Sequence, residues 1–446
     1  MARTDVTDAT LPDAPPEDAR PSRLSPWCWV PSLYFAQALP NVFVMTVSTY
    51  AYTRMGISAV LIGYTSWLGL PWMLKPFWSP LVELLGTERR WIWATEFLAS
   101  AAFATVAVGY ASEHFFLWTL IGYFLLSVAS ATHDIAADGY YMRVLSPHDQ
   151  TWFVGIRSVA FRGGWIFAEG LLVWLAGRLI RLGYDPAVAW GATHGAAAGT
   201  FFLLAAYHAA VLPTAPTKPH AGAISVGKVA RDVVKIFTKF FAVIPLASAL
   251  PFLLLYRFAE AQVVKFIGKF LLDSRAEGGL GLLEEQVGFI NGTLGIAALL
   301  AGGVIGSMLA ARDGLRAWLF PMAVMMNMTN IAFLALAYFQ PENLAYVGLA
   351  VVIEKFGYGL GFTGYMLYLL YLARGEHQTS FYAICTGFMT LGLILPGSLA
   401  GYPLQWLGYT GFFLWILVAT IPSFLVTWIV FRQMDRHPDI AFRRAD

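Results

Sequence analysis

The sequence contains little charge. Only 13% of its 446 residues are Asp, Glu, Lys or Arg, whereas 58% are hydrophobic; a soluble protein usually has about 25% charged residues. Apolar windows long enough to cross a bilayer as helices recur along almost the whole chain, which indicates a membrane protein without a sizeable soluble domain. The formal net charge is +2. This near balance gives no reason to expect a nucleic-acid partner.

Cysteine is also scarce. Cys28 and Cys385 are far apart in the sequence, so they predict neither a disulfide framework nor a metal site, and we expect no cofactor. The HExxH, GxSxG, Walker and CxxC signatures are missing as well. These absences favour a transport protein over an enzyme.

The N-terminus lacks the apolar core of a signal peptide. Residues 1–26 are acidic and rich in proline. This composition predicts a disordered cytoplasmic tail rather than a cleaved segment.

Apolar windows and the polar breaks between them predict an all-α polytopic membrane protein with twelve transmembrane helices. The expected spans are 28–53, 58–84, 91–110, 114–141, 152–178, 190–212, 240–271, 285–311, 317–339, 343–373, 378–406 and 410–432. The longest polar connection divides them into two sets of six. We therefore expect an N-terminal bundle at 27–212, a cytoplasmic linker at 213–239, a C-terminal bundle at 240–432 and a tail at 433–446.

The distribution of basic residues predicts the orientation. Lys and Arg are concentrated in the linker and in the C-terminal stretch FRQMDRHPDIAFRRAD. Cytoplasmic loops carry the excess of these residues in membrane proteins, so we expect both termini in the cytoplasm.

An internal repeat supports the division into halves. SPLVELLGTERRWIW at 79–93 aligns without gaps on GSMLAARDGLRAWLF at 306–320, which pairs Arg89 with Arg316 and Trp91 with Trp318. Two parallel halves of six helices are the layout of the major facilitator superfamily, in which the substrate cavity lies between the halves near mid-membrane.

Ionisable residues inside the expected helices are the strongest functional signal. Each costs about 2.5–3.5 kcal/mol at the bilayer centre unless it is paired or hydrated. Most of them must therefore face one another or a wet cavity. They are Lys75, Glu96, His133, Asp134, Asp138, Arg157, Arg162, Glu169, Arg257, Glu260, Lys265, Glu354 and Lys355.

Three of these ionisable residues are less favoured as functional residues. Glu96 and Glu169 have no obvious partner at their depth in the sequence-based helices. His133 is expected to be a helix histidine with satisfied hydrogen bonds, as are His194 and His208.

One acidic helix face is predicted in the N-terminal half. Asp134, Asp138 and Tyr141 share a face by their i, i+4 and i, i+7 spacing. Lys75, Arg157 and Arg162 lie at overlapping depths on neighbouring helices. Two interpretations remain open for this group: the carboxylates take part in proton coupling, or they hold a fixed ion pair that serves as a gate.

A substrate cavity is predicted nearer the C-terminal half. Arg257 and Glu260 are spaced i, i+3 and are expected to pair, and Lys355 lies near mid-membrane, where a cation attracts a carboxylate or phosphate. The cavity residues that we expect are Tyr34, Gln37, Trp72, Arg257, Glu260, Gln262, Lys265, Glu354, Lys355 and Tyr365.

The same segment also permits a rival function, that of a membrane-bound acyltransferase. His133 and Asp138 also form the H-x4-D spacing that some acyltransferases use. Residues separated by five positions point about 140° apart on a helix, which argues against a catalytic pair. A membrane-bound acyltransferase and a receptor without transport are therefore the less favoured alternatives.

Three segments resemble one family. LPWMLKPFWSPLVELL with ERRWIW, HDIAADGYYMRVL and GIRSVAFRGG are similar to segments of the AmpG-type muropeptide permeases and of the related acetyl-coenzyme A transporters, over residues 30–175. His133 stands where the permeases tend to have Gln, and Tyr140–Tyr141 also depart from their pattern.

The resemblance implies a proton-driven importer in a bacterial inner membrane. Its substrates would be N-acetylglucosaminyl-anhydro-N-acetylmuramyl peptides, moved by alternating access through the rocking of two bundles. Related branches carry iron–siderophore complexes or acetyl-coenzyme A, so those solutes are the alternatives. We expect a monomer whose partners are protons, the lipid bilayer and a small anionic or sugar-containing substrate.

Overall fold

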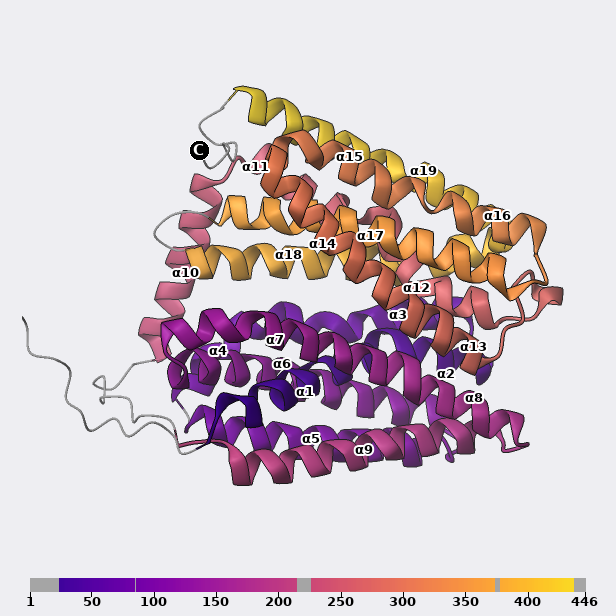
Figure 1. Ribbon diagram of the computed structural model, residues 1–446, viewed down its shortest axis with the longest axis horizontal. Helices are drawn as coiled ribbons and strands as arrows, with labels where there is room; N and C mark the ends of the chain where they lie inside the picture. The colour runs from indigo at the N-terminus through magenta and orange to yellow at the C-terminus, as the bar shows by residue number, and fades with distance from the viewer. Residues whose placement is uncertain (1–23, 85, 215–225, 374–377, 437–446) are drawn as a thin grey trace, which may run out of the picture.

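The computed structural model describes residues 24–84, 86–214, 226–373 and 378–436, and within these ranges every regular element is helical. Two bundles lie one above the other, the N-terminal half in indigo to magenta and the C-terminal half in pink to yellow (Figure 1). Most of the two predicted tails, 1–26 and 433–446, therefore lies outside the described residues, as do residues 215–225 of the predicted linker.

The N-terminal half contains the helical segments up to Val211. They are η1 (Pro26–Cys28), α1 (Val30–Val42), η2 (Phe43–Val47), α2 (Ser48–Arg54), α3 (Ala59–Tyr64), η3 (Thr65–Gly69), α4 (Leu70–Leu84), α5 (Glu88–Gly109), α6 (Phe115–Val144), α7 (Pro147–Trp165), η4 (Ile166–Leu172), α8 (Val173–Arg181) and α9 (Pro186–Val211).

The C-terminal half follows from Val226. Its segments are α10 (Val226–Val243), α11 (Leu246–Leu255), α12 (Phe258–Leu272), η5 (Arg275–Glu277), α13 (Glu284–Phe289), η6 (Ile290–Gly295), α14 (Ile296–Asp313), α15 (Leu315–Met328), α16 (Ile331–Phe339), α17 (Leu344–Leu372), α18 (Gln378–Leu399) and α19 (Gly401–Arg436).

Each of the twelve predicted spans coincides with helical structure. Among the described residues, nine helices are long and apolar enough to cross a membrane, or ten if the bent pair Val234–Ala242 and Leu246–Leu272 counts as one span. The two remaining predicted spans correspond to α3–η3–α4 and to α9. The all-helical membrane fold expected from the apolar windows is thus confirmed.

The helix predicted at 240–271 is divided in the structure. α10 begins at Val226, inside the predicted linker, and the chain turns at Pro245 before α11 starts. Proline has no backbone N–H and clashes with the preceding turn, so Pro245 favours a break between α10 and α11. A second break at Arg257 (φ −102°, ψ 18°) separates α11 from α12.

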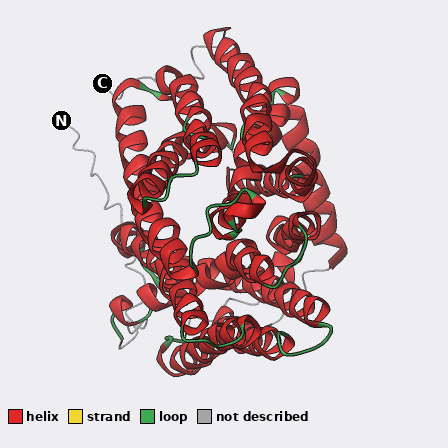
Figure 2. Cartoon of the chain, turned by 90° about the vertical axis from the view of Figure 1, so that its right-hand side faces the viewer, coloured by secondary structure: helices red, strands yellow, loops and turns green. Residues whose placement is uncertain are grey.

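Both ends of the described chain lie on one side of the molecule. α1 begins and α19 ends at the left in Figure 1, where α10 crosses between the two halves. We call this side the terminal face and the opposite side the far face. Figure 2 looks onto the far face and shows the helices of both halves nearly end on, with the loops that join them.

The two halves touch along one flank. α18 of the C-terminal half packs against α3, η3 and α4 of the N-terminal half, and α19 also reaches α3. The approach is closest at Gly401, where a Cβ atom would lie 2.4 Å from the Ala59 carbonyl oxygen. Only glycine permits this backbone contact.

On the other flank, the most extensive contacts between the halves among the described residues lie near the far face. There η4 and α8 pack against α13 and η6, and a Cβ atom on Gly292 would lie 2.5 Å from the Glu169 carbonyl oxygen. Towards the terminal face α14 diverges from α7 (Figure 1). Among the described residues, this flank therefore has extensive helix contacts near the far face, and α7 and α14 make none of comparable extent towards the terminal face.

Three π-helical segments occur where the halves meet. η2, η4 and η6 interrupt α-helical structure in the first, fifth and eighth predicted spans, and η4 contacts both of the others. A π-helical turn contains an extra residue and is often found at functional sites. Sequence periodicity gave no indication of these segments.

A buried carboxylate ties four helices of the N-terminal half together. Both Glu96 carboxylate oxygens accept from His208 Nδ1, at 2.7 and 2.9 Å, and His133 Nε2 lies 3.2 Å from Oε1. His208 Nε2 is in turn 2.9 Å from the Ser32 hydroxyl. The expectation that Glu96 lacks a partner was wrong, because its partners come from α6 and α9, whose proximity the sequence does not reveal.

The histidine expectations are confirmed by the same contacts. His133 and His208 bond Glu96, and His194 lies 2.7 Å from the Tyr123 hydroxyl and 2.8 Å from the Trp190 carbonyl oxygen. All three imidazoles are satisfied inside the N-terminal half.

The Glu96 network leads to a stability prediction. Glu96 and His208 are fully buried, so Glu96→Gln weakens hydrogen bonds to a charged group and leaves a histidine nitrogen poorly matched. We expect the free energy of unfolding in detergent to fall by about 1–3 kcal/mol. Thermal unfolding followed by tryptophan fluorescence measures this. Glu113→Gln, at an exposed position, is the matched control, and equal stability of the two variants would contradict the prediction.

Candidate functional site

The predicted acidic face of α6 carries two ion pairs. Asp134 Oδ2 lies 3.5 Å from Lys75 Nζ on α4, and Asp138 Oδ1 lies 3.0 Å from Arg157 Nη2 on α7. The structure therefore brings together four of the five residues predicted for coupling or gating. Both pairs lie within the N-terminal half, so neither locks the two halves together in this state.

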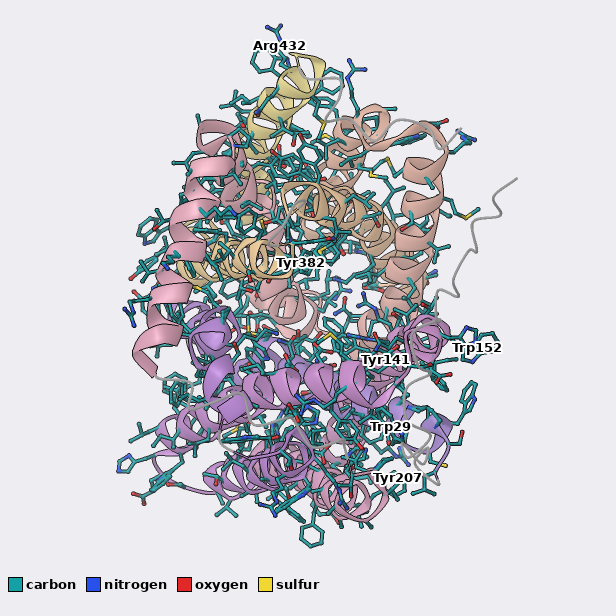
Figure 3. The ribbon with its side chains drawn as sticks, turned by 90° about the vertical axis from the view of Figure 1, so that its left-hand side faces the viewer. Trp29, Tyr141, Trp152, Tyr207, Tyr382 and Arg432 are labelled. Atoms are coloured by element: carbon teal, nitrogen blue, oxygen red, sulfur yellow. The ribbon has the colours of Figure 1, made fainter. Side chains whose placement is uncertain are left out.

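Two tyrosines hold Arg157 in place. Tyr34 donates its hydroxyl to Asp138 Oδ1 at 3.0 Å, and the Arg157 guanidinium lies 4.2 Å from the centre of the Tyr34 ring and 5.1 Å from that of Tyr141. Such cation–π contacts stabilise a partly dehydrated arginine. Figure 3, which looks onto the terminal face, shows Tyr141 on the side of the N-terminal half that faces the C-terminal half.

Solvent reaches this group. The side chains of Asp138 and Arg157 are 39% and 31% exposed, and that of Lys75 is 35% exposed. These charges therefore lie at the surface of the N-terminal half, towards the terminal face.

A second charged group lies on α12 and α17 of the C-terminal half. Arg257 Nε donates to Glu260 Oε2 at 3.0 Å, which confirms the predicted pair. Lys355 Nζ lies 3.4 Å from the neighbouring Glu354 carboxylate. All four residues are at most 8% exposed.

Tyr358 connects this group with the N-terminal half. Arg257 Nη2 donates to the Tyr358 hydroxyl at 2.7 Å, and Arg162 on α7 interacts electrostatically with the same phenol from the opposite half. Arg162 forms no ion pair with any carboxylate of the described chain. Tyr358 was not predicted, because a tyrosine inside an apolar helix has no distinguishing pattern.

A buried lysine also crosses between the halves. Lys265 on α12 is 5% exposed, and its Nζ donates to Thr65 Oγ1 of η3 at 2.8 Å. No carboxylate among the described residues pairs with it. Arg162 and Lys265 thus place two basic side chains between the halves, and no carboxylate among the described residues pairs with either.

The other predicted cavity residues have different surroundings. Gln37 lies beside Asp134, and Trp72 packs against the apolar core shared by the halves. Gln262 accepts from Trp415 Nε1 at 2.9 Å. Tyr365 is fully buried and donates to the Leu253 carbonyl oxygen at 2.6 Å, so its hydroxyl is already satisfied inside the C-terminal half.

Two ion pairs between the halves close the far face. Arg54 at the end of α2 pairs with Glu284 of α13 and donates to the Leu282 carbonyl oxygen at 2.9 Å. Arg181 at the end of α8 lies 2.9 Å from Glu285. None of these four residues was singled out in the sequence, because charges at helix ends are common at the membrane surface.

Glu169 lies beneath these ion pairs, also between the halves. Its Oε1 accepts from the Tyr50 hydroxyl at 2.6 Å and from Asn291 Nδ2 at 2.5 Å. The expectation that Glu169 lacks a partner was wrong, since Tyr50 and Asn291 reach it from η2–α2 and from η6.

The described residues offer no catalytic pair at the H-x4-D segment. His133 bonds Glu96, whereas Asp138 bonds Tyr34 and Arg157. Within the same described ranges, no cluster of three His, Cys, Asp or Glu side chains is arranged to hold a metal ion.

Known proteins with similar sequences are transporters. Residues 38–172 match the BT1 family. The anhydromuropeptide permease of Escherichia coli K12 is 26% identical over 409 residues, which cover 90% of this chain and 78% of that protein. A putative AmpG transporter of Rickettsia conorii is 22% identical and covers 88% of this chain and 94% of its own.

Solved structures with the same fold are transporters too. A bacterial homologue of the lysosomal transporter Spinster, in an inward-facing and unoccupied conformation, superposes with a TM-score of 0.68 at 14% identity, covering 93% of this chain and 98% of its own. A D-xylose–proton symporter has a TM-score of 0.64 at 12% identity, with 90% and 95% covered. The chain therefore has the fold of these solved transporters, and its sequence is similar to AmpG-type permeases over most of its length.

Proposed function

We propose that the chain imports an anionic, sugar-containing solute in symport with protons, as a monomer in a bacterial inner membrane. The observation that carries this proposal is the excess of positive charge between the halves. Arg162 and Arg257 approach Tyr358 from opposite halves, and Lys265 has no carboxylate partner in the described chain. A buried cation requires a counter-charge, which a substrate carboxylate would provide.

Anhydromuropeptides fit this chemistry. They combine acetylated sugars with peptide carboxylates, and the E. coli relative is named for them. Tyr358 and Phe362 place aromatic rings beside Arg257, where a sugar ring can pack. Iron–siderophore complexes and acetyl-coenzyme A are also anionic and are the competing substrates.

Alternating access explains the contacts between the halves. The far face is closed by two ion pairs and the terminal face is separated beside α7, so the structure corresponds to a state open towards the terminal face. We place this face in the cytoplasm, since α10 with Arg231 and Lys235 and the end of α19 with Arg432 lie there (Figure 1). Release of an imported solute would take place from this state.

The charge pairs on α6 line the open side. We propose that Asp134 and Asp138, with Lys75 and Arg157, take part either in proton coupling or in gating at the terminal face. Asp138 favours the gating role, because its partners Tyr34 and Arg157 and its partial exposure place it where the halves meet when the terminal face closes.

Arg162 provides the test of substrate binding. Arg162→Gln removes a charge-assisted contact worth about 1.5–3 kcal/mol, so we expect the apparent affinity for an anhydromuropeptide to fall about 10- to 100-fold. Counterflow of radiolabelled N-acetylglucosaminyl-anhydro-N-acetylmuramyl peptide in proteoliposomes measures it. Arg312→Gln, at a side chain that is 69% exposed, is the control.

The same assay separates the substrate classes. Unlabelled muropeptide, a ferric siderophore and acetyl-coenzyme A are added in turn as competitors. Inhibition by only the second or third would replace the muropeptide assignment, and unchanged counterflow in Arg162→Gln would remove Arg162 from the substrate site.

The α6 carboxylates provide the test of coupling. If either carries a proton, Asp134→Asn or Asp138→Asn abolishes accumulation driven by a proton gradient but leaves counterflow intact, because only the protonation step is lost. If they serve as a gate, both modes of transport slow together. Normal accumulation by both variants would exclude either role.

The far-face ion pairs provide the test of gating. Arg54→Glu places two carboxylates together at the closed face and should open it, since like charges in partial burial repel strongly. We expect faster labelling by a membrane-impermeant reagent of a cysteine introduced there. Glu284→Arg in the same chain restores opposite charges and should restore slow labelling; failure of this rescue would argue against the lock.

A further inference from the structure

A pocket with two arginines lies at the terminal face, outside the region between the halves. It has a volume of about 390 Å³ and is lined by Thr87, Arg89, Arg90, Trp93, Ala209 and Thr214. The first four residues lie at the start of α5, and the last two lie at the end of α9 and just beyond it. α5 and α9 run side by side at the outer edge of the N-terminal half (Figure 1).

Arg89 is fixed in position and still has a donor without an acceptor. Its Nη2 donates to the Ala209 carbonyl oxygen at 2.7 Å, which anchors the guanidinium on the last turn of α9. Its Nε is buried and has no hydrogen-bond partner among the described residues. A buried donor of this kind costs free energy until an acceptor reaches it. A ligand with acceptor oxygens would remove this cost.

Arg90 adds a second guanidinium at an exposed position. Glu88 precedes both arginines in the sequence, but it pairs with Arg143 of α6. In the part of the chain that the structure describes, no carboxylate forms an ion pair with Arg89 or Arg90. The pocket therefore concentrates positive charge in a place that a ligand can reach from outside.

The chemistry of the lining fits a phosphate group. A guanidinium donates two parallel hydrogen bonds to a phosphate, and arginine is favoured wherever such planar recognition occurs. The hydroxyls of Thr87 and Thr214 add further donors. The pocket lies at the ends of membrane-spanning helices, where phospholipid headgroups are located, and Trp93 belongs to the residue type that gathers at this depth. Basic pockets between helices at this level bind lipid headgroups.

A row of aromatic rings leads from the pocket along the outer side of α5 and α9. The rings of Trp93 and Phe97 are 6.3 Å apart, centre to centre, and those of Phe97 and Phe202 are 5.6 Å apart. Phe202 is 56% exposed. The row runs from the end of the helices towards the middle of the span, so an acyl chain whose headgroup fills the pocket can lie along it.

We propose that this pocket binds the phosphate of an anionic phospholipid, with an acyl chain along the aromatic row. Inorganic phosphate has the same chemistry at the guanidiniums, but it makes no contact with the row, which favours the lipid. The site is formed by the N-terminal half alone and does not include Arg162, Lys265 or Tyr358. Its ligand is therefore distinct from the transported solute, and the assignment goes beyond the proposed function.

The internal repeat supplies a matched control in the other half. Arg316 at the start of α15 corresponds to Arg89, whereas Ala317 stands where the first copy has Arg90. The Arg316 guanidinium lies 5.0 Å from the centre of the Phe431 ring. The second copy thus offers one guanidinium where the first offers two. Arg316→Gln removes the same charge as a variant of the pocket but leaves the pocket intact.

The test counts the phospholipids that purified full-length protein retains. Native mass spectrometry from detergent is performed at an activation energy that removes loosely bound lipid, with dioleoylphosphatidylglycerol as the titrated probe. Dioleoylphosphatidylcholine has the same acyl chains and a phosphate but no net charge, so we expect it to be retained less. Arg90→Gln should lower the apparent affinity for phosphatidylglycerol about 10- to 100-fold, because charge-assisted hydrogen bonds are lost. Arg316→Gln should bind as the unmodified protein does.

Two further measurements distinguish a lipid from free phosphate. Trp93→Ala shortens the aromatic row but keeps both arginines, so it should weaken retention of phosphatidylglycerol. Ammonium phosphate in molar excess should leave the lipid bound, because the acyl chain adds apolar contact that inorganic phosphate lacks. Displacement by phosphate, or full retention in Trp93→Ala, would overturn the assignment to a lipid.

The arginine variants decide whether the pocket is a site at all. Unchanged retention in Arg90→Gln, an equal loss in Arg316→Gln, or equal retention of the two phospholipids would overturn the proposal. Arg90 is exposed, so its variant is expected to fold even if Arg89→Gln, which also loses the bond to Ala209, does not. Because no transported solute is added, an incorrect substrate assignment leaves this result intact and shows only in the uptake assays.

Discussion

Charge inside a membrane must be neutralised, and most of this structure is arranged around that constraint. Glu96 is held by two histidines, Asp138 by Arg157 and Tyr34, and Arg257 by Glu260. The pairs within one half can remain intact while the halves move. Glu169, Arg162 and Lys265 differ, because their partners lie in the other half or because no carboxylate among the described residues pairs with them.

The charged groups differ in kind between the far face, the middle and the terminal face of the molecule. The far face has ion pairs and close backbone contacts that join the halves, the middle has basic side chains that no carboxylate among the described residues pairs with, and the terminal face has partly exposed pairs within the N-terminal half. A solute with negative charge would supply what the middle lacks. Its departure into the open side leaves the cations again without partners, which favours rearrangement of the halves over a fixed resting state.

Local sequence patterns predicted some of these features well. Helical spacing placed Asp134, Asp138 and Tyr141 on one face, and i, i+3 spacing paired Arg257 with Glu260, because both depend only on helix geometry. The partners of Glu96 and Glu169 depend on which distant helices touch, and no spacing encodes that. The π-helical segments were missed for a related reason: they insert one residue into a pattern that otherwise reads as an ordinary apolar helix.

The continuous contact of α18 with α3 and α4 determines how the halves can move. Because this flank holds close backbone contacts, with Gly401 against Ala59, the halves are expected to rotate about it rather than move apart in parallel. Rotation about one edge widens the opposite edge most. A bulky solute would therefore leave beside α7 and α14, and the path through the protein would be off-centre.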